Sequence, residues 1–196
     1  MLKRAFDIGF SLGWLICFSP LLLVVALLVR LKLGSPVLFI QERPGLRAKP
    51  FRMVKFRTMN DARGPDGDLL PDDQRLTSFG RFLRATSLDE FPEMWNVLIG
   101  DMSVVGPRPL LMRYVPRYDA FQARRMEVKP GVTGWAQING RNTLTWEEKF
   151  ALDVWYVDNR SFGLDMKIVV LTFFRVLARS GAERPASAPP LEEFRG

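Results

Sequence analysis

The sequence predicts a mostly α-helical protein with one small β-hairpin, an α+β fold, behind an N-terminal segment apolar enough for a membrane. Three observations support this prediction. Residues 8–29 hold no charged side chain. Two short stretches of strand-forming residues flank a Pro-Gly turn. Several longer stretches have the spacing of amphipathic helices. The 196 residues suit one globular domain.

Composition excludes several kinds of chemistry. The chain has no His and one Cys, Cys17, so Ser-His-Asp and Cys-His catalysis, His-containing zinc sites and an internal disulfide framework are ruled out. We expect Cys17 to pack within its apolar run. Any general base must then be a carboxylate or a perturbed Lys, and a catalytic metal would be a hard, oxygen-bound ion such as Mg²⁺.

The apolar run from Ile8 to Val29 would reach about 33 Å as a straight helix, enough to span a bilayer. Ser19-Pro20 lies near its middle, where proline predicts a kink and the Ser hydroxyl can bond a freed carbonyl. Positive charge flanks both ends and favours neither for translocation. Two topologies stay open: a kinked span, and a helix–break–helix that enters and leaves on the cytoplasmic face. The flanking cations are Lys3, Arg4, Arg30 and Lys32.

The predicted β-hairpin comprises Pro36–Gln41 and Phe51–Met59, joined around Pro44-Gly45. Alternation places two apolar residues and then two cations, Lys55 and Arg57, on one face of the second strand. An exposed edge with snorkelling stems is the simplest interpretation of these cations. The apolar residues on that face are Phe51 and Met53.

Asp61–Asp73 holds five Asp residues and little apolar content, which predicts a mobile surface loop. The last predicted helix, Leu164–Leu177, is very apolar, so it is either a core helix or one in the membrane interface. Ser180–Gly196 is typical of a disordered tail. The other helices are predicted at Thr77–Ala85, Pro92–Ile99, Leu110–Arg125 and Trp146–Val157.

Asp89 and Glu90 are the strongest candidates for chemistry. Pro92 favours a first helical turn, so both acids lie at or just before a helix N-terminus. There the helix dipole favours an ionised Asp89 and would also attract a substrate phosphate. A capping box formed by Ser87 and Glu90 explains the same residues without any function.

Two later segments offer anion-binding groups. Arg108 is the only cation of a stiff turn built from Gly106 and two prolines, and a guanidinium so held suits bidentate recognition of phosphate. Lys129–Asn142 is rich in glycine and could bring backbone N–H groups to an anion, although a structural series of turns fits the same composition.

Six segments together resemble those of the bacterial sugar transferases, the monotopic polyprenol-phosphate phosphoglycosyl transferases. They occur in the family's order and cover the chain from Lys3 to Leu171. The segments are Lys3–Ser11, Ser19-Pro20, Pro36–Gly45, Phe51–Met59, Ser87–Pro109 and Lys129–Asn142.

The resemblance implies transfer of a phosphosugar from a UDP-sugar to polyprenol phosphate, with release of UMP, as the first membrane step of glycan or glycoconjugate biosynthesis. It also implies a monotopic protein of the bacterial cytoplasmic membrane. Residues 1–33 would form a re-entrant helix broken at Ser19-Pro20. Residues 34–179 would form a catalytic domain on the cytoplasmic side, and residues 180–196 a tail.

The resemblance also implies roles for individual residues. Asp89 would be the nucleophile of a covalent phosphosugar intermediate and a ligand of Mg²⁺, with Glu90 as its partner. Arg108 would bind phosphate, and Lys55 would be a further cation of the catalytic site. Two more residues are placed near the nucleotide or the metal, Arg141 and Asp153.

The net charge of +7 also fits a basic module that binds nucleic acid or anionic lipid, but such a module leaves Asp89 and Glu90 without a purpose. A third hypothesis is a membrane anchor that recruits glycan enzymes, and turnover with a UDP-sugar would distinguish it from an enzyme. An enzyme acting on phosphorylated substrates at an anionic leaflet explains both the charge and the acids. We therefore expect a UDP-sugar, polyprenol phosphate and anionic membrane lipid as partners, and no nucleic acid. A homodimer is compatible with the sequence.

Overall fold

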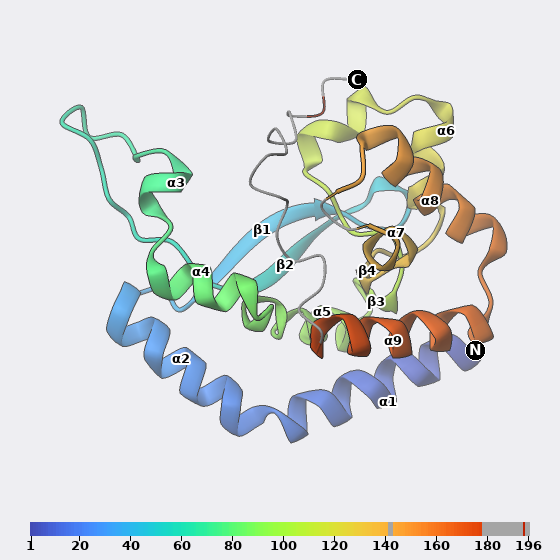
Figure 1. Cartoon of the computed structure of the whole chain (residues 1–196), viewed down its shortest axis with the longest axis horizontal. Coiled ribbons are helices and arrows are strands. Elements are labelled where there is room, and N and C mark those ends of the chain that lie inside the picture. Colours follow the sequence, from blue (N-terminus) through green and yellow to red (C-terminus); the bar gives the residue numbers. More distant parts are fainter. Residues whose placement is uncertain (141–142, 178–193, 195–196) are drawn as a thin grey trace.

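The structure is a computed structural model that describes residues 1–140, 143–177 and 194. In Figure 1 two N-terminal helices form a shallow V along one side of the molecule, and the remaining elements lie within its concave side. The described chain is mostly helical with two small sheets, so the predicted fold class is confirmed. The predicted tail, residues 180–196, lies outside the described residues except for Phe194.

The V consists of α1 (Leu2–Cys17) and α2 (Ser19–Leu33), which meet at an angle of 63°. By length and apolar composition no single described helix could cross a membrane, whereas this bent pair could. The Ser19 hydroxyl donates to the Ile16 carbonyl at 2.8 Å, and Pro20 lies in the first turn of α2. The predicted break at Ser19-Pro20 is confirmed. Cys17 is exposed, so the expectation that it packs is wrong.

Polar side chains fasten the first turns of α1 to the globular part. Lys3 forms an ion pair with Asp165 at 2.6 Å, and Arg4 donates to two backbone carbonyls at the end of α5 (Glu93–Ile99). Asp7, 3% exposed, accepts from the Ser103 hydroxyl and the Val104 N–H, both at 3.0 Å. At the other end of the V, Val25 and Val29 of α2 belong to a buried cluster with Phe56 and Leu83. Both ends of the bent pair therefore meet the same globular domain.

The predicted β-hairpin is confirmed. Strands β1 (Leu38–Pro44) and β2 (Pro50–Phe56) pair antiparallel, with Gln41 opposite Met53, and the 3-10 helix η1 (Leu46–Ala48) lies in the connection. The interpretation of Lys55 and Arg57 as an exposed edge is wrong. Their side chains are only 16% and 9% exposed. Helices that follow in the chain pack against β2 and cover Lys55, whereas Arg57 donates to the backbone carbonyls of Ser35 and Met59.

The segment after the hairpin extends away from the body (Figure 1) and contains the short helix α3 (Asp72–Arg75) and a bridge between Arg63 and Leu69. The predicted surface loop is thus present, while its mobility stays a prediction. The predicted helix Thr77–Ala85 is confirmed as α4 (Ser78–Ala85), with Thr77 as its N-cap.

The helix predicted over Leu110–Arg125 is wrong as a continuous element. The structure instead forms η3 (Met112–Arg117), α6 (Ala120–Ala123) and η4 (Arg124–Glu127). Pro116 removes a backbone donor, and Asp119 starts a new helix through a capping box with Gln122.

A second sheet, which the sequence did not reveal, pairs β3 (Ser103–Val105) with β4 (Gly131–Thr133) in parallel. A Cβ atom on Gly131 would lie 2.0 Å from the Gly106 nitrogen, so glycine lets the two backbones approach. Short helices η2 (Leu88–Glu90) and α7 (Trp135–Ile138) and longer helices α5 (Glu93–Ile99), α8 (Trp146–Asn159) and α9 (Phe162–Leu177) complete the fold.

Helix α9 packs on the core, as one of the two predicted alternatives has it, while a position in the membrane interface stays a prediction. Ile168 is fully buried in the main core, together with Met102 and Tyr156. Phe173 and Phe174 are about three-fifths exposed, at 62% and 61%. One face of α9 therefore completes the core, and the other presents large apolar side chains outside the globular body.

Candidate active site

The acidic pair Asp89-Glu90 lies in η2, at the corner between α4 and α5. Ser87 adopts a left-handed conformation (φ 56°), which turns the chain sharply after α4. The Ser87 side chain does not cap η2, and the Glu90 carboxylate bonds Lys55 and Arg108 instead. The capping-box interpretation is therefore wrong.

Asn96 fixes α5 against the hairpin. Its side-chain oxygen accepts from the Val54 N–H at 3.0 Å, and its amide nitrogen donates to the Arg52 carbonyl at 2.8 Å. These bonds provide partners for two backbone polar groups at the edge of β2 that does not pair with β1. Because Lys55 follows Val54 on the same strand, Glu90 and Glu93 are brought to its ammonium group.

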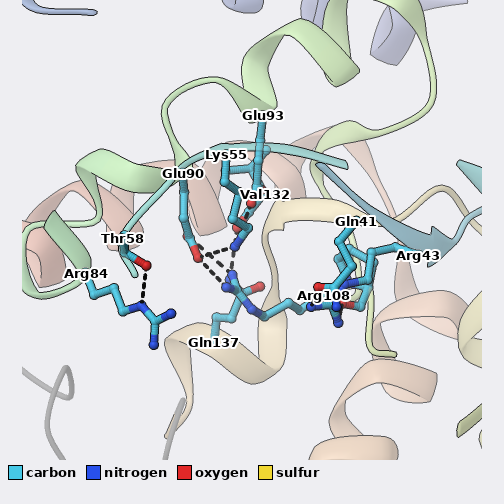
Figure 2. Close-up of polar contacts among 11 residues, drawn as sticks. Gln41, Arg43, Lys55, Thr58, Arg84, Glu90, Glu93, Arg108, Val132 and Gln137 are labelled. Carbon is cyan, nitrogen blue, oxygen red and sulfur yellow. Dashed lines mark hydrogen bonds and ion pairs between the residues drawn. The ribbon is translucent and has the colours of Figure 1, made fainter. Parts of the chain in front are cut away.

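The result is a cluster of two acids and two cations (Figure 2). Lys55 Nζ lies 3.0 Å from Glu90 Oε1 and 2.9 Å from Glu93 Oε1. Arg108 binds both carboxylate oxygens of Glu90, one of them at 3.3 Å. Burial opposes ionisation of Glu90, but Arg108 and Lys55 hold the pKa of this carboxyl well below its usual range. Glu90 is therefore a firmly ionised anchor for both cations.

Asp89 differs from its neighbour. It is 8% exposed, and no hydrogen bond or ion pair to its carboxylate is found within residues 1–140, 143–177 and 194. Burial, and then the charge of Glu90, raise the pKa of Asp89 to about 6. The expectation that the helix start favours the ionised form is outweighed by burial, although Asp89 is still mostly ionised at pH 7. It is an unengaged carboxylate next to a cationic cluster.

Arg84 is a third cation near the acids, and the sequence reasoning missed it. Its Nε donates to the Thr58 hydroxyl at 3.1 Å, which directs the guanidinium toward the Glu90 side of the cluster (Figure 2). A Cβ atom on Gly80 would lie 1.8 Å from the Thr58 carbonyl oxygen, so glycine lets α4 approach this closely. The charge of Arg84 partly offsets the raised pKa of Asp89.

Two arginines hold the turn that carries Arg108. Arg125 donates to the Arg108 carbonyl at 2.8 Å, and Arg43 donates to the Pro109 carbonyl at 3.4 Å. Asp153 is 2% exposed and forms an ion pair with Arg125 at 2.6 Å. The structure therefore places Asp153 behind the Arg108 turn and not beside Asp89. Arg141 lies outside the described residues.

A cavity of about 620 Å³ lies beside the acidic pair. Ser87 and Glu90 are among its polar lining residues. Its apolar walls come from α1, from the residues around α5 and from α9, and include Phe10, Trp14, Phe91, Val169 and Phe173. An apolar cavity with a few polar groups at one side is typical of a site for a partly apolar ligand.

Within the described residues no group of three or more His, Cys, Asp or Glu side chains could hold a metal ion. Mg²⁺ does not need such a group, since it often binds through one or two carboxylates together with substrate phosphates and water. The unengaged Asp89 fits this limited role. Glu90 fits it less well, because Lys55 and Arg108 occupy its oxygens.

Comparison with known proteins points to a single family. The sequence model described as "Bacterial sugar transferase" matches residues 1–179. The chain is 58% identical to "Uncharacterized sugar transferase EpsL" of Bacillus subtilis (strain 168), over 94% of this chain and 91% of that protein.

Two longer relatives carry more specific names. "Galactosyl transferase CpsE" of Streptococcus agalactiae serotype III (strain NEM316) is 41% identical over 92% of this chain and 43% of its own length. "UDP-glucose:undecaprenyl-phosphate glucose-1-phosphate transferase" of Klebsiella pneumoniae is 43% identical over 88% of this chain and 39% of its own length. The chain thus spans about two-fifths of these two relatives.

Proposed function

Because the chain belongs to the bacterial sugar transferase family, an enzyme family, we propose that it transfers a sugar 1-phosphate from a UDP-sugar to a polyprenol phosphate, releasing UMP. The observation that carries this proposal is the unengaged Asp89 carboxylate beside a cationic cluster, next in the chain to Glu90, which lines an apolar cavity. The substrates named for the Klebsiella relative, UDP-glucose and undecaprenyl phosphate, have the two chemistries that this arrangement suits.

In the first displacement, a carboxylate oxygen of Asp89 attacks the phosphorus that carries the sugar. The bond from this phosphorus to the bridging oxygen breaks, and its electron pair leaves with UMP. The pKa of about 6 makes Asp89 a better nucleophile than an ordinary aspartate while it stays ionised at neutral pH. Arg108 and Lys55 bind the phosphate oxygens, since phosphoryl transfer depends on positioning and on neutralising charge.

In the second displacement, an oxygen of the polyprenol phosphate attacks the same phosphorus. The bond to Asp89 breaks, which restores the carboxylate and yields a polyprenyl-diphosphate sugar. The apolar cavity supports this step, because its walls of aromatic and aliphatic side chains can hold the first isoprene units next to Glu90.

Mg²⁺ bound by Asp89 and the substrate diphosphate would neutralise charge on the leaving UMP. The residues of the chain supply the rest of the binding. Glu90 anchors Arg108 and Lys55 before the donor arrives, and Arg125 holds the Arg108 turn in place.

We also propose that α1 enters a bacterial cytoplasmic membrane from the cytoplasmic side and that α2 leads back to the same side. The contacts of Lys3, Arg4 and Asp7 support this re-entrant topology, because they hold the start of α1 on the domain to which α2 leads. A full span would have to break these contacts. The exposed Phe173 and Phe174 of α9 can lie in the membrane interface.

The test is UMP release by the detergent-solubilised chain against a panel of UDP-sugars, with Mg²⁺, with and without polyprenol phosphate. We expect one or a few donors to give UMP and a lipid-linked product. Absence of release for every donor, beside a related enzyme that is active in the same assay, would favour the anchor hypothesis instead.

A further inference from the structure

Glu93 is a buried acid to which the proposed reaction assigns no role. It is the first residue of α5, and it is 1% exposed. Burial and the charge of Glu90 raise the pKa of Glu93, whereas the adjacent ammonium group of Lys55 opposes this shift and favours the carboxylate. Removing a carboxylate this far from solvent costs free energy of desolvation, which an ion pair must offset. Since Glu93 is almost fully buried, it cannot contact a donor, an acceptor or a metal ion.

The partner of Glu93 is Lys55. The ammonium group lies between two acids, 2.9 Å from Glu93 and 3.0 Å from Glu90 (Figure 2). Glu90 in turn is shared by Lys55 and Arg108. Lys55 therefore has a partner on the catalytic side, which substrate phosphates can displace, and a second partner on the buried side, which they cannot reach.

The charged groups that face Glu93 come from four parts of the fold. Lys55 on β2 makes direct contact, and Glu90 on η2 acts through its charge. Arg108, on the turn after β3, and Arg43, on β1, add positive charge at longer range. Among the described residues, Lys55 is the group that Glu93 meets in an ion pair.

We propose that Glu93 is a positioning residue for Lys55. It holds the ammonium group at the site while Lys55 exchanges Glu90 for the phosphate oxygens of an incoming nucleoside diphosphate sugar. Without the charge of Glu93, Glu90 is the one carboxylate partner of Lys55, so the ammonium group is no longer held from the buried side when the donor displaces Glu90. The catalytic part of this inference rests on the proposed function, whereas the effect of Glu93 on Lys55 does not.

The kinetic test compares wild type with Glu93→Gln, which keeps the shape of the side chain and removes its charge. We expect kcat/KM for the UDP-sugar to fall about tenfold, mainly through a higher donor KM, while the KM for polyprenol phosphate stays unchanged. Glu93→Asp keeps the charge and should recover part of the loss. Glu42→Gln, on the exposed side of β1, is the matched control and should behave as wild type.

Two results would overturn the proposal. One is an equal loss for both substrates together with a lower Tm, which indicates a merely structural role. The other is an undiminished effect of Glu93→Gln when Lys55 is already Met, because a residue that acts through Lys55 must lose its effect in that background. In the intact site we expect Glu93→Gln to leave Tm unchanged, since Lys55 keeps Glu90 as its partner.

A second readout separates this inference from the proposed reaction. Competitive acetylation of Lys55, followed by peptide mass spectrometry, needs no substrate. We expect Glu93→Gln to raise the labelling rate of Lys55 several-fold, because the amine loses one of the two side chains that hold it in place. An unchanged rate overturns the positioning role even in an active enzyme. A raised rate in a chain that releases no UMP supports that role and contradicts the proposed function.

Discussion

Two acid–arginine pairs lie on either side of the same turn, and they differ in how far solvent reaches their side chains. On the side of the acidic pair, the side chains of Arg108 and Glu90 are 37% and 15% exposed. Behind the turn, those of Arg125 and Asp153 are 3% and 2% exposed. Arg125 also donates to Tyr118 and to the Arg108 carbonyl, so most of its N–H groups are hydrogen-bonded. The same chemistry thus gives a partly accessible pair, which we expect a substrate to exchange, and a fully buried pair that supports the turn from behind.

The largest effect is expected for a substitution of Asp89, which belongs to neither pair. Asp89→Asn should lower UMP release at least about a thousandfold, because an amide cannot form the covalent intermediate. The Tm should not fall, since the Asp89 carboxylate makes no bond within the described residues. The measurement is initial rate with both substrates, and the exposed Asp73→Asn serves as control. Near-wild-type turnover would remove Asp89 from the reaction.

The next effect tests the exchangeable pair. Arg108→Met should lower turnover about a hundredfold, which is typical for loss of one group that stabilises transition-state charge. The Tm should change little, because Glu90 still pairs with Lys55 and its side chain is partly accessible to water. Steady-state kinetics and thermal unfolding of the same preparation measure both quantities. A large fall in Tm would show that this pair is as structural as the one behind it.

For the buried pair of Arg125 and Asp153 we expect the reverse: a large loss of stability and a small loss of activity. Arg125→Met leaves Asp153 buried without its partner, which should cost about 3–5 kcal/mol of unfolding free energy. The fraction that stays folded should keep a rate much closer to wild type than Arg108→Met does. Denaturant unfolding followed by Trp fluorescence gives the free energy. A stable but inactive variant would instead place Arg125 in the catalytic machinery.

The smallest effect is expected for a substitution of Arg124, the residue before Arg125. Arg124 pairs with Asp158 at the surface, where both partners are exposed and solvent weakens the attraction. Arg124→Met should leave both Tm and turnover unchanged in the same two assays. It is the matched control for Arg125→Met, since the two positions share η4 and differ mainly in burial. A loss comparable to that of Arg125→Met would refute burial as the cause.

Much of this arrangement follows from local sequence. Ser19-Pro20 predicts the helix break, because proline cannot continue the backbone bonds of α1. Alternation around Pro44-Gly45 predicts the hairpin, and Pro92 places Asp89 and Glu90 at a helix start. In each case the signal lies within a few residues of the feature.

Long-range contacts explain what the sequence did not reveal. Glu93 reads as an ordinary acid in a first helical turn, and only the bonds of Asn96 to β2 bring it to Lys55. Asp153 likewise bonds Arg125, from which it is separated by 28 positions in the sequence. The continuous helix predicted over Leu110–Arg125 is wrong because helical spacing outweighed Pro116 and the capping box of Asp119.

The most direct test of the central claim is the intact mass of the protein after incubation with UDP-sugar and Mg²⁺ in the absence of polyprenol phosphate. An unengaged Asp89 that attacks the donor predicts an added mass equal to one phosphosugar. This mass should be absent in Asp89→Asn and lost when polyprenol phosphate is added. UMP release that requires the acceptor, with no mass added at any time, would contradict the covalent role of Asp89.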